Sequence, residues 1–164
     1  MGDKFICRMK FKIVAVGKIK ESYLREAIAE YVKRISRFAG VEIVEVEECL
    51  SRGAQNSKEI ERVKKAEGEA ILSKLEGHVV VMDINGSLLS SEQLAAHITE
   101  QKQFNSTFTF VIGGSNGLSD DVKSRADLRC SFGKITLPHQ LFRVVLLEQL
   151  YRACCIEGNV PYHK

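Results

Sequence analysis

The chain has 164 residues, of which 45% are hydrophobic and 27% are charged, and its formal net charge at pH 7 is +3. This length suits one domain with a core of its own, and the balanced composition excludes disordered and fibrous proteins. The mildly basic charge permits an anionic partner such as nucleic acid without requiring one.

The first third of the chain predicts a strand, a helix and a second strand. Residues 11–16 change from alternating to continuously apolar, which predicts a buried strand that ends at Gly17. Apolar residues at steps of three and four then predict an amphipathic helix over 21–39, stopped by Gly40. Residues 41–47 have the character of a strand again.

The middle of the chain continues this alternation. Asn56, with a glutamate three residues later, predicts the start of a helix over 57–75, whose many charges are most simply a solvated face. Residues 79–84 are apolar on both faces, as in a central parallel strand. An Asn-Gly pair at 85–86 then predicts a turn toward a helix over 91–104.

The last third predicts two more extended segments and two helices. Residues 107–112 form a buried strand, and Ser119 caps a short helix that ends near residue 126. Residues 130–137 contain another extended piece, and a long helix covers 140–158. The packed face of this long helix is marked by Val144, Leu147, Leu150, Tyr151 and Cys154.

Strands and helices alternate along the chain without a Pro/Gly-rich linker or a repeat of fixed period. This pattern predicts a single α/β domain with a mainly parallel sheet flanked by helices. In sheets of this kind, ligands bind beyond the carboxyl ends of the strands. A binding site is therefore expected in the segments that follow the predicted strands.

The cysteines argue against two kinds of covalent support. They number five, which is odd, and they show no CxxC spacing or nearby paired histidines. Zinc and a disulfide framework are both disfavoured, and we expect a reducing compartment. No apolar stretch approaches the ~20 residues that cross a bilayer, and the start of the chain has no core of a signal peptide. We expect a cytoplasmic protein with no metal and no membrane partner.

The run FTFVIGGSNG over 108–117 is a strand that leads into a glycine-rich turn. Glycines there let the backbone N–H groups approach a small polar ligand closely, which predicts a cofactor pocket. The spacing G-G-x-x-G is neither the dinucleotide fingerprint nor a Walker loop. The alternative is a tight loop whose glycines only satisfy backbone torsion angles, and the run alone does not decide between the two.

Four segments carry a resemblance to a known family. They are MKFKIVAVGKIK over 9–20, FVIGGSNGLS over 110–119, KITLPHQLFRVVLLEQLYRA over 134–153 and PYHK over 161–164. Together they closely resemble the RlmH family, the SPOUT-class methyltransferases that act on a pseudouridine of large-subunit ribosomal RNA. The resemblance covers residues 9–164 as one methyltransferase domain and leaves residues 1–8 as an N-terminal extension.

The resemblance implies features that periodicity does not predict. The C-terminal part of the domain would be tied in a deep trefoil knot, which general rules of topology would otherwise reject. The protein would be a homodimer, with each S-adenosylmethionine pocket at the subunit interface. The implied cofactor contacts come from the end of the third strand, from the glycine turn and from one loop; they are Met82, Gly114, Phe132, Gly133, Lys134, Ile135, Thr136 and Leu137.

Three residues near the end of the chain are assigned to catalysis. Arg152 has the geometry to orient a phosphate or a base carbonyl through two hydrogen bonds. Tyr162 would stack on an unpaired base or donate its hydroxyl, and His163 would accept a proton near neutral pH. In an ordinary protein such a tail is a frayed surface, but the resemblance of the ending PYHK favours a functional role.

Three further residues are assigned to substrate binding: His139, Arg143 and Lys164. For His139 the alternative is helix capping or loop packing, and for Arg143 it is an ion pair at an interface. Arg143 and Arg152 are nine positions apart, about half a turn in azimuth at ~3.6 residues per turn, so we expect them on different faces of the helix.

The function implied by the resemblance is methyl transfer from S-adenosylmethionine to N3 of a pseudouridine in a loop of 23S ribosomal RNA, on assembled ribosomes. The sulfonium methyl is already activated, so catalysis consists mainly of positioning and removal of the N3 proton. The alternative is a catalytically silent α/β module that binds ribosomal RNA or a nucleotide through the same basic surface.

Overall fold

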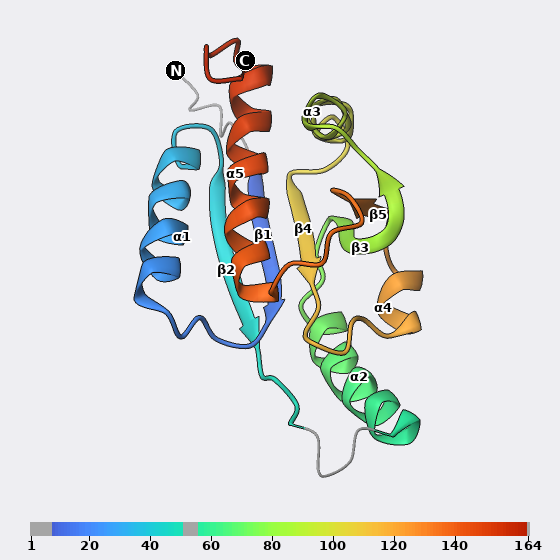
Figure 1. The fold of residues 1–164 in the computed structure, drawn as a ribbon. Helices are drawn as coiled ribbons and strands as arrows, with labels where there is room; N and C mark the ends of the chain where they lie inside the picture. Colours follow the sequence, from blue (N-terminus) through green and yellow to red (C-terminus); the bar gives the residue numbers. More distant parts are fainter. Residues whose placement is uncertain (1–7, 51–55, 164) are drawn as a thin grey trace, which may run out of the picture.

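A computed structural model describes residues 8–50 and 56–163 of the chain. Five strands form one sheet in the order β2-β1-β4-β3-β5, and every neighbouring pair is parallel (Figure 1). The strands are β1 (Lys10–Val16), β2 (Gly40–Val46), β3 (His78–Leu88), β4 (Thr107–Ile112) and β5 (Leu128–Ser131). The helices are α1 (Ser22–Ile35), α2 (Ser57–Leu72), α3 (Ser91–Gln101), α4 (Asp120–Ser124) and α5 (His139–Glu157). The predicted single α/β domain with a mainly parallel sheet is confirmed.

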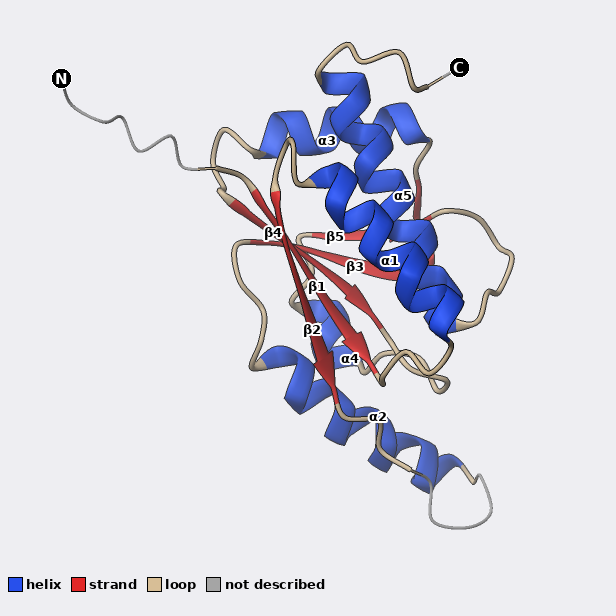
Figure 2. Ribbon diagram, turned by 90° about the vertical axis from the view of Figure 1, so that its left-hand side faces the viewer, coloured by secondary structure: helices blue, strands red, loops and turns tan. Residues whose placement is uncertain are grey.

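Helices cover both faces of the sheet, which is why its strands are apolar on both sides. Helices α1, α3 and α5 lie together on one face, and α2 with α4 lies on the other (Figure 2). Strand β1 serves both layers, since Phe11 and Ile13 belong to the core beneath α5 whereas Val14 and Val16 belong to the core beneath α2. The core is therefore split by the sheet into two apolar layers.

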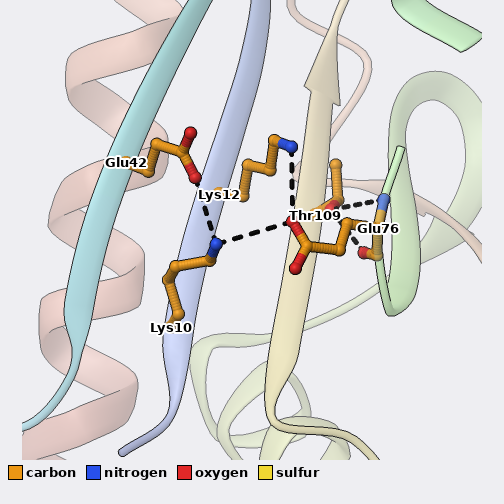
Figure 3. Close-up of polar contacts among 5 residues, drawn as sticks. All are labelled: Lys10, Lys12, Glu42, Glu76 and Thr109. Atoms are coloured by element: carbon orange, nitrogen blue, oxygen red, sulfur yellow. Dashed lines mark hydrogen bonds and ion pairs between the residues drawn. The ribbon is translucent and has the colours of Figure 1, made fainter. Parts of the chain in front are cut away.

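The face that carries α2 is apolar only toward the carboxyl ends of the strands. Nearer the amino ends, Lys10 pairs with Glu42 of β2 at 3.1 Å and with Glu76 at 3.5 Å, and Lys12 pairs with Glu76 at 3.3 Å (Figure 3). The hydroxyl of Thr109 donates to the Glu76 carbonyl at 2.5 Å and accepts from the Glu76 N–H at 3.2 Å. These partly exposed pairs stabilise the fold only weakly, but they tie the chain after α2 to two central strands.

The order of the predicted elements is confirmed, but three helices end earlier than the periodicity predicts. The chain leaves α1 at Ile35, α2 at Leu72 and α3 at Gln101 through turns in which an N–H bonds the carbonyl three residues back, as Phe38 does to Ile35. The prediction that Gly40 stops this helix is wrong. Gly40 is the first residue of β2, and its N–H donates to the Met9 carbonyl.

The predicted turn at 85–86 is also wrong. Strand β3 continues to Leu88 through a bulge, in which Met82 and Ser87 both face Cys130 of β5. A Cβ at Gly86 would lie 2.6 Å from the Arg129 backbone, so this glycine permits the close approach of the two strands. The extended piece predicted within 130–137 begins earlier and is shorter, since β5 runs over Leu128–Ser131 and the residues after it form a loop.

Two expectations about the chain as a whole stay predictions. One is the trefoil knot in the C-terminal part. The other is the N-terminal extension over residues 1–8, which apart from Arg8 lies outside the described residues.

Candidate functional site

A cavity of about 540 Å³ lies at the carboxyl ends of β3, β4 and β5. Its wall comes from the bulge of β3, the glycine turn after β4, the loop after β5 and the first turns of α5. This is the edge of the sheet where ligands of parallel α/β proteins bind. The position expected for a pocket from the sequence is therefore the position of a real cavity.

Seven of the eight residues expected to contact a cofactor line this cavity: Met82, Gly114, Phe132, Gly133, Ile135, Thr136 and Leu137. Lys134 is exposed and does not belong to the lining. His139, expected to contact substrate, lines the cavity as well. The fold thus brings together segments that are more than fifty residues apart in the sequence, as Met82 and His139 are.

Two glycines shape the cavity wall through their backbone conformation. Gly117 has φ of 80°, and its N–H closes the turn on the Gly114 carbonyl at 3.0 Å. Gly133 has φ of 134°, and the Ser131 hydroxyl accepts from its N–H at 3.2 Å. A Cβ would meet nothing within 4 Å at either position, so the constraint at both is the left-handed backbone and not space.

Gly114 is constrained for a different reason, since its φ is not positive. A Cβ there would lie 3.1 Å from both the Glu67 Oε2 atom and the Val16 Cγ1 atom. The glycine turn therefore packs directly against the end of β1 and against helix α2.

The carboxyl group of Glu67 lies behind the glycine turn and is a feature that the sequence analysis missed. Glu67 is only 4% exposed. Its Oε1 atom accepts from the Cys49 N–H at 3.1 Å, and its Oε2 atom is buried without a hydrogen-bond partner among the described residues. Burial raises the pKa of Glu67, the Cys49 N–H lowers it, and the nearby Glu48 charge raises it further.

The charges of α2 were predicted to form a solvated face, and for Glu67 this is wrong. The available signal was the glycine that follows it inside a helix, since a mid-helix glycine costs about 1 kcal/mol unless something requires it. A Cβ at Gly68 would lie 2.4 Å from the Ser119 hydroxyl oxygen. Gly68 therefore lets α2 approach the segment after β4, and this approach buries Glu67.

Arg143 does not lie where a substrate residue must lie. It is 1% exposed, its Nη1 atom pairs with Glu45 at 2.9 Å, and its Nη2 atom donates to the Gly17 carbonyl at 3.1 Å. The predicted substrate contact is wrong for this residue, because the first turns of α5 direct it inward onto the ends of β1 and β2. The alternative was an ion pair at an interface, whereas the ion pair that Arg143 makes here lies within the chain.

His139 is the first residue of α5 and lies beside the end of β1. Its Nε2 atom is 3.8 Å from the position that a Cβ of Gly17 would take. The helix cap is Pro138, which makes no side-chain hydrogen bond, so capping does not account for this histidine. Its place in the cavity wall leaves substrate contact as a prediction.

The tail of the chain folds back on α5 and α3. The Arg152 guanidinium pairs with Glu148 at 2.6 Å and lies 3.2 Å from the Nδ1 atom of His163. The Nε2 atom of His163 lies 2.6 Å from Glu92, and the Tyr162 hydroxyl donates to Glu148 at 3.2 Å. We call Arg152, Tyr162, His163, Glu148 and Glu92 the tail cluster.

Tyr162 is packed rather than frayed. Its ring meets that of Tyr151 edge to face, with centroids 4.8 Å apart, and lies 4.8 Å from the Arg152 guanidinium carbon. Burial and the Glu148 charge raise the pKa of Tyr162. Lys164, the last of the predicted substrate residues, lies outside the described residues.

The cavity lies against the first turns of α5, whereas Arg152 of the tail cluster lies in its C-terminal half. Val145 lines the cavity, and Arg152 follows seven residues later, about 10 Å along the helix axis at ~1.5 Å per residue. No residue of the tail cluster belongs to the described cavity wall. Figure 1 shows the same separation, since the C-terminus lies at one end of α5 and the glycine turn at the other. Within one chain, the predicted catalytic residues do not meet the predicted cofactor residues.

Two structural features are absent from residues 8–50 and 56–163. No helix there is long and apolar enough to cross a membrane. The same residues contain no cluster of three or more His, Cys, Asp or Glu side chains arranged to hold a metal ion.

Comparison with known proteins adds independent findings. The family model described as a predicted SPOUT methyltransferase matches residues 9–163. The ribosomal RNA large subunit methyltransferase H of Streptococcus pneumoniae strain CGSP14 is 49% identical over 160 residues, covering 95% of this chain and 100% of that protein. The protein of the same name from strain TIGR4 matches equally well.

Among solved structures, a probable methylase family protein from Haemophilus influenzae Rd KW20 is similar, with a TM-score of 0.50. The match covers 94% of this chain and 70% of that one. At 11% identity, this similarity concerns the fold alone.

Proposed function

The chain belongs to the SPOUT methyltransferase family and, within it, to the RlmH family, and on this premise we propose that it methylates large-subunit ribosomal RNA. The methyl donor is S-adenosylmethionine, and the acceptor is N3 of a pseudouridine in a loop of 23S RNA. The observation that carries the proposal is the cavity at the carboxyl edge of the sheet, lined by seven of the eight expected cofactor residues. Such a substrate places the protein with ribosomes in the cytoplasm.

The cavity has the properties that S-adenosylmethionine requires. Its volume of about 540 Å³ lies in the ordinary range for a small-molecule site. Met82, Phe132 and Leu137 offer an apolar slot for an adenine ring, and the glycines of the wall bring backbone groups within reach of its edge. When bound, this cofactor supplies a methyl group already activated by a sulfonium.

The remaining chemistry belongs to the protein. The N3–H of the acceptor lies between two carbonyls and is weakly acidic, so a cation nearby favours the anion that attacks the methyl group. Arg152 supplies that cation, and Glu148 holds its guanidinium in a fixed orientation. His163 takes the proton on Nδ1, which gives up its contact with the Arg152 Nη1 atom, and Glu92, 2.6 Å from Nε2, stabilises the imidazolium that results.

In our proposal these two parts of the site come from two chains. Arg152 lies about 10 Å along α5 from Val145 in the cavity wall, at ~1.5 Å per residue, which supports a site completed by a second subunit. A homodimer with α5 helices in opposite directions would place the tail of each subunit at the cavity of the other. This arrangement agrees with the interfacial pocket that family membership implies.

The test is methylation by purified protein with labelled S-adenosylmethionine. The substrates are ribosomes lacking this modification, separated subunits and naked RNA, each with uridine or pseudouridine at the target. We expect transfer to pseudouridine in assembled ribosomes and little transfer to naked RNA, because a domain of charge +3 has few phosphate contacts to offer. Equal methylation of naked RNA containing uridine contradicts the proposal. Binding to ribosomes without binding to the cofactor supports the silent RNA-binding module instead.

A further inference from the structure

The carboxylate of Glu67 is a buried group near the cavity that the proposed chemistry does not use. It lies behind Gly114, and the Cβ position of that glycine is 3.1 Å from Oε2 and 3.5 Å from Oε1. Gly114 itself lines the cavity. Only backbone therefore separates the carboxylate from the space in which a ligand would bind.

The surroundings of Glu67 leave its charge uncompensated. One oxygen accepts the Cys49 N–H, and the other has no hydrogen-bond partner among the described residues. No described Lys, Arg or His side chain forms an ion pair with it. Burial raises the pKa of this carboxyl because it makes the charged form costly, so a positive charge that comes near it favours the charged form.

The neighbouring helix is built to keep the carboxylate in this place. Gly68 lets α2 approach Ser119, and Val16 lies beside the carboxylate, 3.1 Å from the same Cβ position of Gly114. A side chain at residue 114 would come between the carboxylate and the turn. If α2 lay farther from the turn, only a side chain longer than glutamate could reach it from residue 67. The two glycines and the glutamate therefore act together to place a negative charge against the cavity wall.

The two forms of the cofactor differ in a charge of the matching sign. S-adenosylmethionine carries a sulfonium, whereas the product S-adenosylhomocysteine has a neutral thioether, and their ammonium and carboxylate groups are the same. An unscreened negative charge near the cavity therefore stabilises the donor more than the product. Such a difference helps the spent cofactor to leave.

We propose that Glu67 determines the preference of the cavity for S-adenosylmethionine over S-adenosylhomocysteine, through its charge acting across the Gly114 backbone. This role rests on the proposed function, because it assumes that the cavity binds this cofactor. Glu67 touches neither the methyl donor nor the RNA in this account, so it is a specificity-determining residue and not a catalytic one.

The test compares calorimetric dissociation constants of the two cofactor forms for wild type, Glu67→Gln and Glu67→Met. Glutamine keeps the shape of the side chain and an oxygen for the Cys49 N–H, and methionine provides a second neutral variant should the first fail to fold. The matched control is Glu69→Gln, which removes the same charge from an exposed position on the same helix. Circular dichroism verifies the fold of each variant.

We expect the neutral variants to bind S-adenosylmethionine about tenfold more weakly while their affinity for S-adenosylhomocysteine changes by less than about twofold. The control should leave both constants unchanged. Equal weakening of both forms would mean that Glu67 only supports the turn, and unchanged affinities would mean that its charge is not felt in the cavity; each overturns the proposal. Failure of the wild-type protein to bind either form would instead overturn the proposed function.

Discussion

The cavity beside the first turns of α5 and the tail cluster beside its later turns are built from different groups. At the N-terminal end of α5, the cavity wall is built largely from backbone, with left-handed glycines at 117 and 133 and a glycine at 114 that leaves room for Glu67. At its C-terminal end, the tail cluster is built from charged side chains that satisfy one another. The first is sensitive to added volume, and the second is sensitive to lost charge.

This difference has a consequence for how each region tolerates change. In the cavity, one apolar side chain can replace another of similar volume, because much of the expected recognition depends on main-chain groups. In the tail cluster, removing one charged partner leaves the others unpaired, and partly buried charges are costly to leave unpaired. Binding and chemical transfer should therefore separate by region.

The largest effect is expected from Gly114→Val. The new side chain would meet the Glu67 carboxylate and Val16, each already 3.1 Å from the Cβ position, and the turn would shift into the cavity. We expect cofactor affinity to fall at least a hundredfold in calorimetric titration. Ser115→Val, which adds the same side chain at an exposed position of the same turn, is the control. A folded Gly114→Val protein with normal affinity would show that the turn does not bind the cofactor.

The next effect is on the rate of transfer. Arg152→Ala, or deletion of residues 162–164, should lower the single-turnover rate about a hundredfold. The first change removes the cation that stabilises the acceptor anion, and the second removes the base that takes its proton. Cofactor affinity should stay within about twofold, since in our proposal these groups face the RNA and not the cofactor. Arg152→Lys, which keeps the charge but not the paired hydrogen bonds, should fall between. An equal loss of cofactor affinity and transfer rate would show that the tail cluster also contributes to cofactor binding.

A third prediction concerns stability and not RNA binding. Arg143→Met should lower the free energy of unfolding by about 2 kcal/mol, because it leaves the Gly17 carbonyl and part of the Glu45 carboxylate without their donor. Urea denaturation measures this change. The salt dependence of ribosome binding should match wild type. If the variant were as stable as wild type and its ribosome binding depended less on salt, Arg143 would contact the substrate after all.

The smallest effect is a pH dependence that belongs to neither region. His78 and His97 lie with their Nε2 atoms 2.8 Å apart, and burial lowers the pKa of both below the usual 6.5. Asp127 at 3.7 Å from His78, and Glu100 beside His97, oppose this shift in part. Because the folded pKa values are depressed, this contribution to stability is complete above pH 6.5 and is lost as pH falls through the folded values.

The check is thermal unfolding between pH 7.5 and pH 5 for wild type and His97→Gln. We expect the melting temperature of wild type to fall by a few degrees more than that of the variant. The methyl-transfer rate of the variant should keep its pH profile, since we propose that His163, and not this pair, takes the proton. A changed rate profile in His97→Gln would connect the pair to the active site.

Local patterns were sufficient for much of the fold. The predicted caps at Asn56 and Ser119 are confirmed, with side chains that accept from the N–H groups of Glu59 and Val122. Residues 107–112 form a strand with the predicted bounds, since a run buried on both faces has few other solutions. Helix ends were less predictable, because the last turns depend on where the chain must go next.

The sequence by itself determined the alternating α/β order, the cavity-forming segments and the family to which the chain belongs, because apolar period and short motifs are local properties. Only the tertiary structure decided which charged side chains are buried. Glu67 lies in a helix rich in charge, where only the following Gly68 signals its burial, and nothing in the sequence around Arg143 distinguishes it from the less buried Arg152 on the same helix. Their burial depends on the close approach of other segments, the ends of β1 and β2 for Arg143 and the glycine turn for Glu67, and such long-range packing has no period in the sequence.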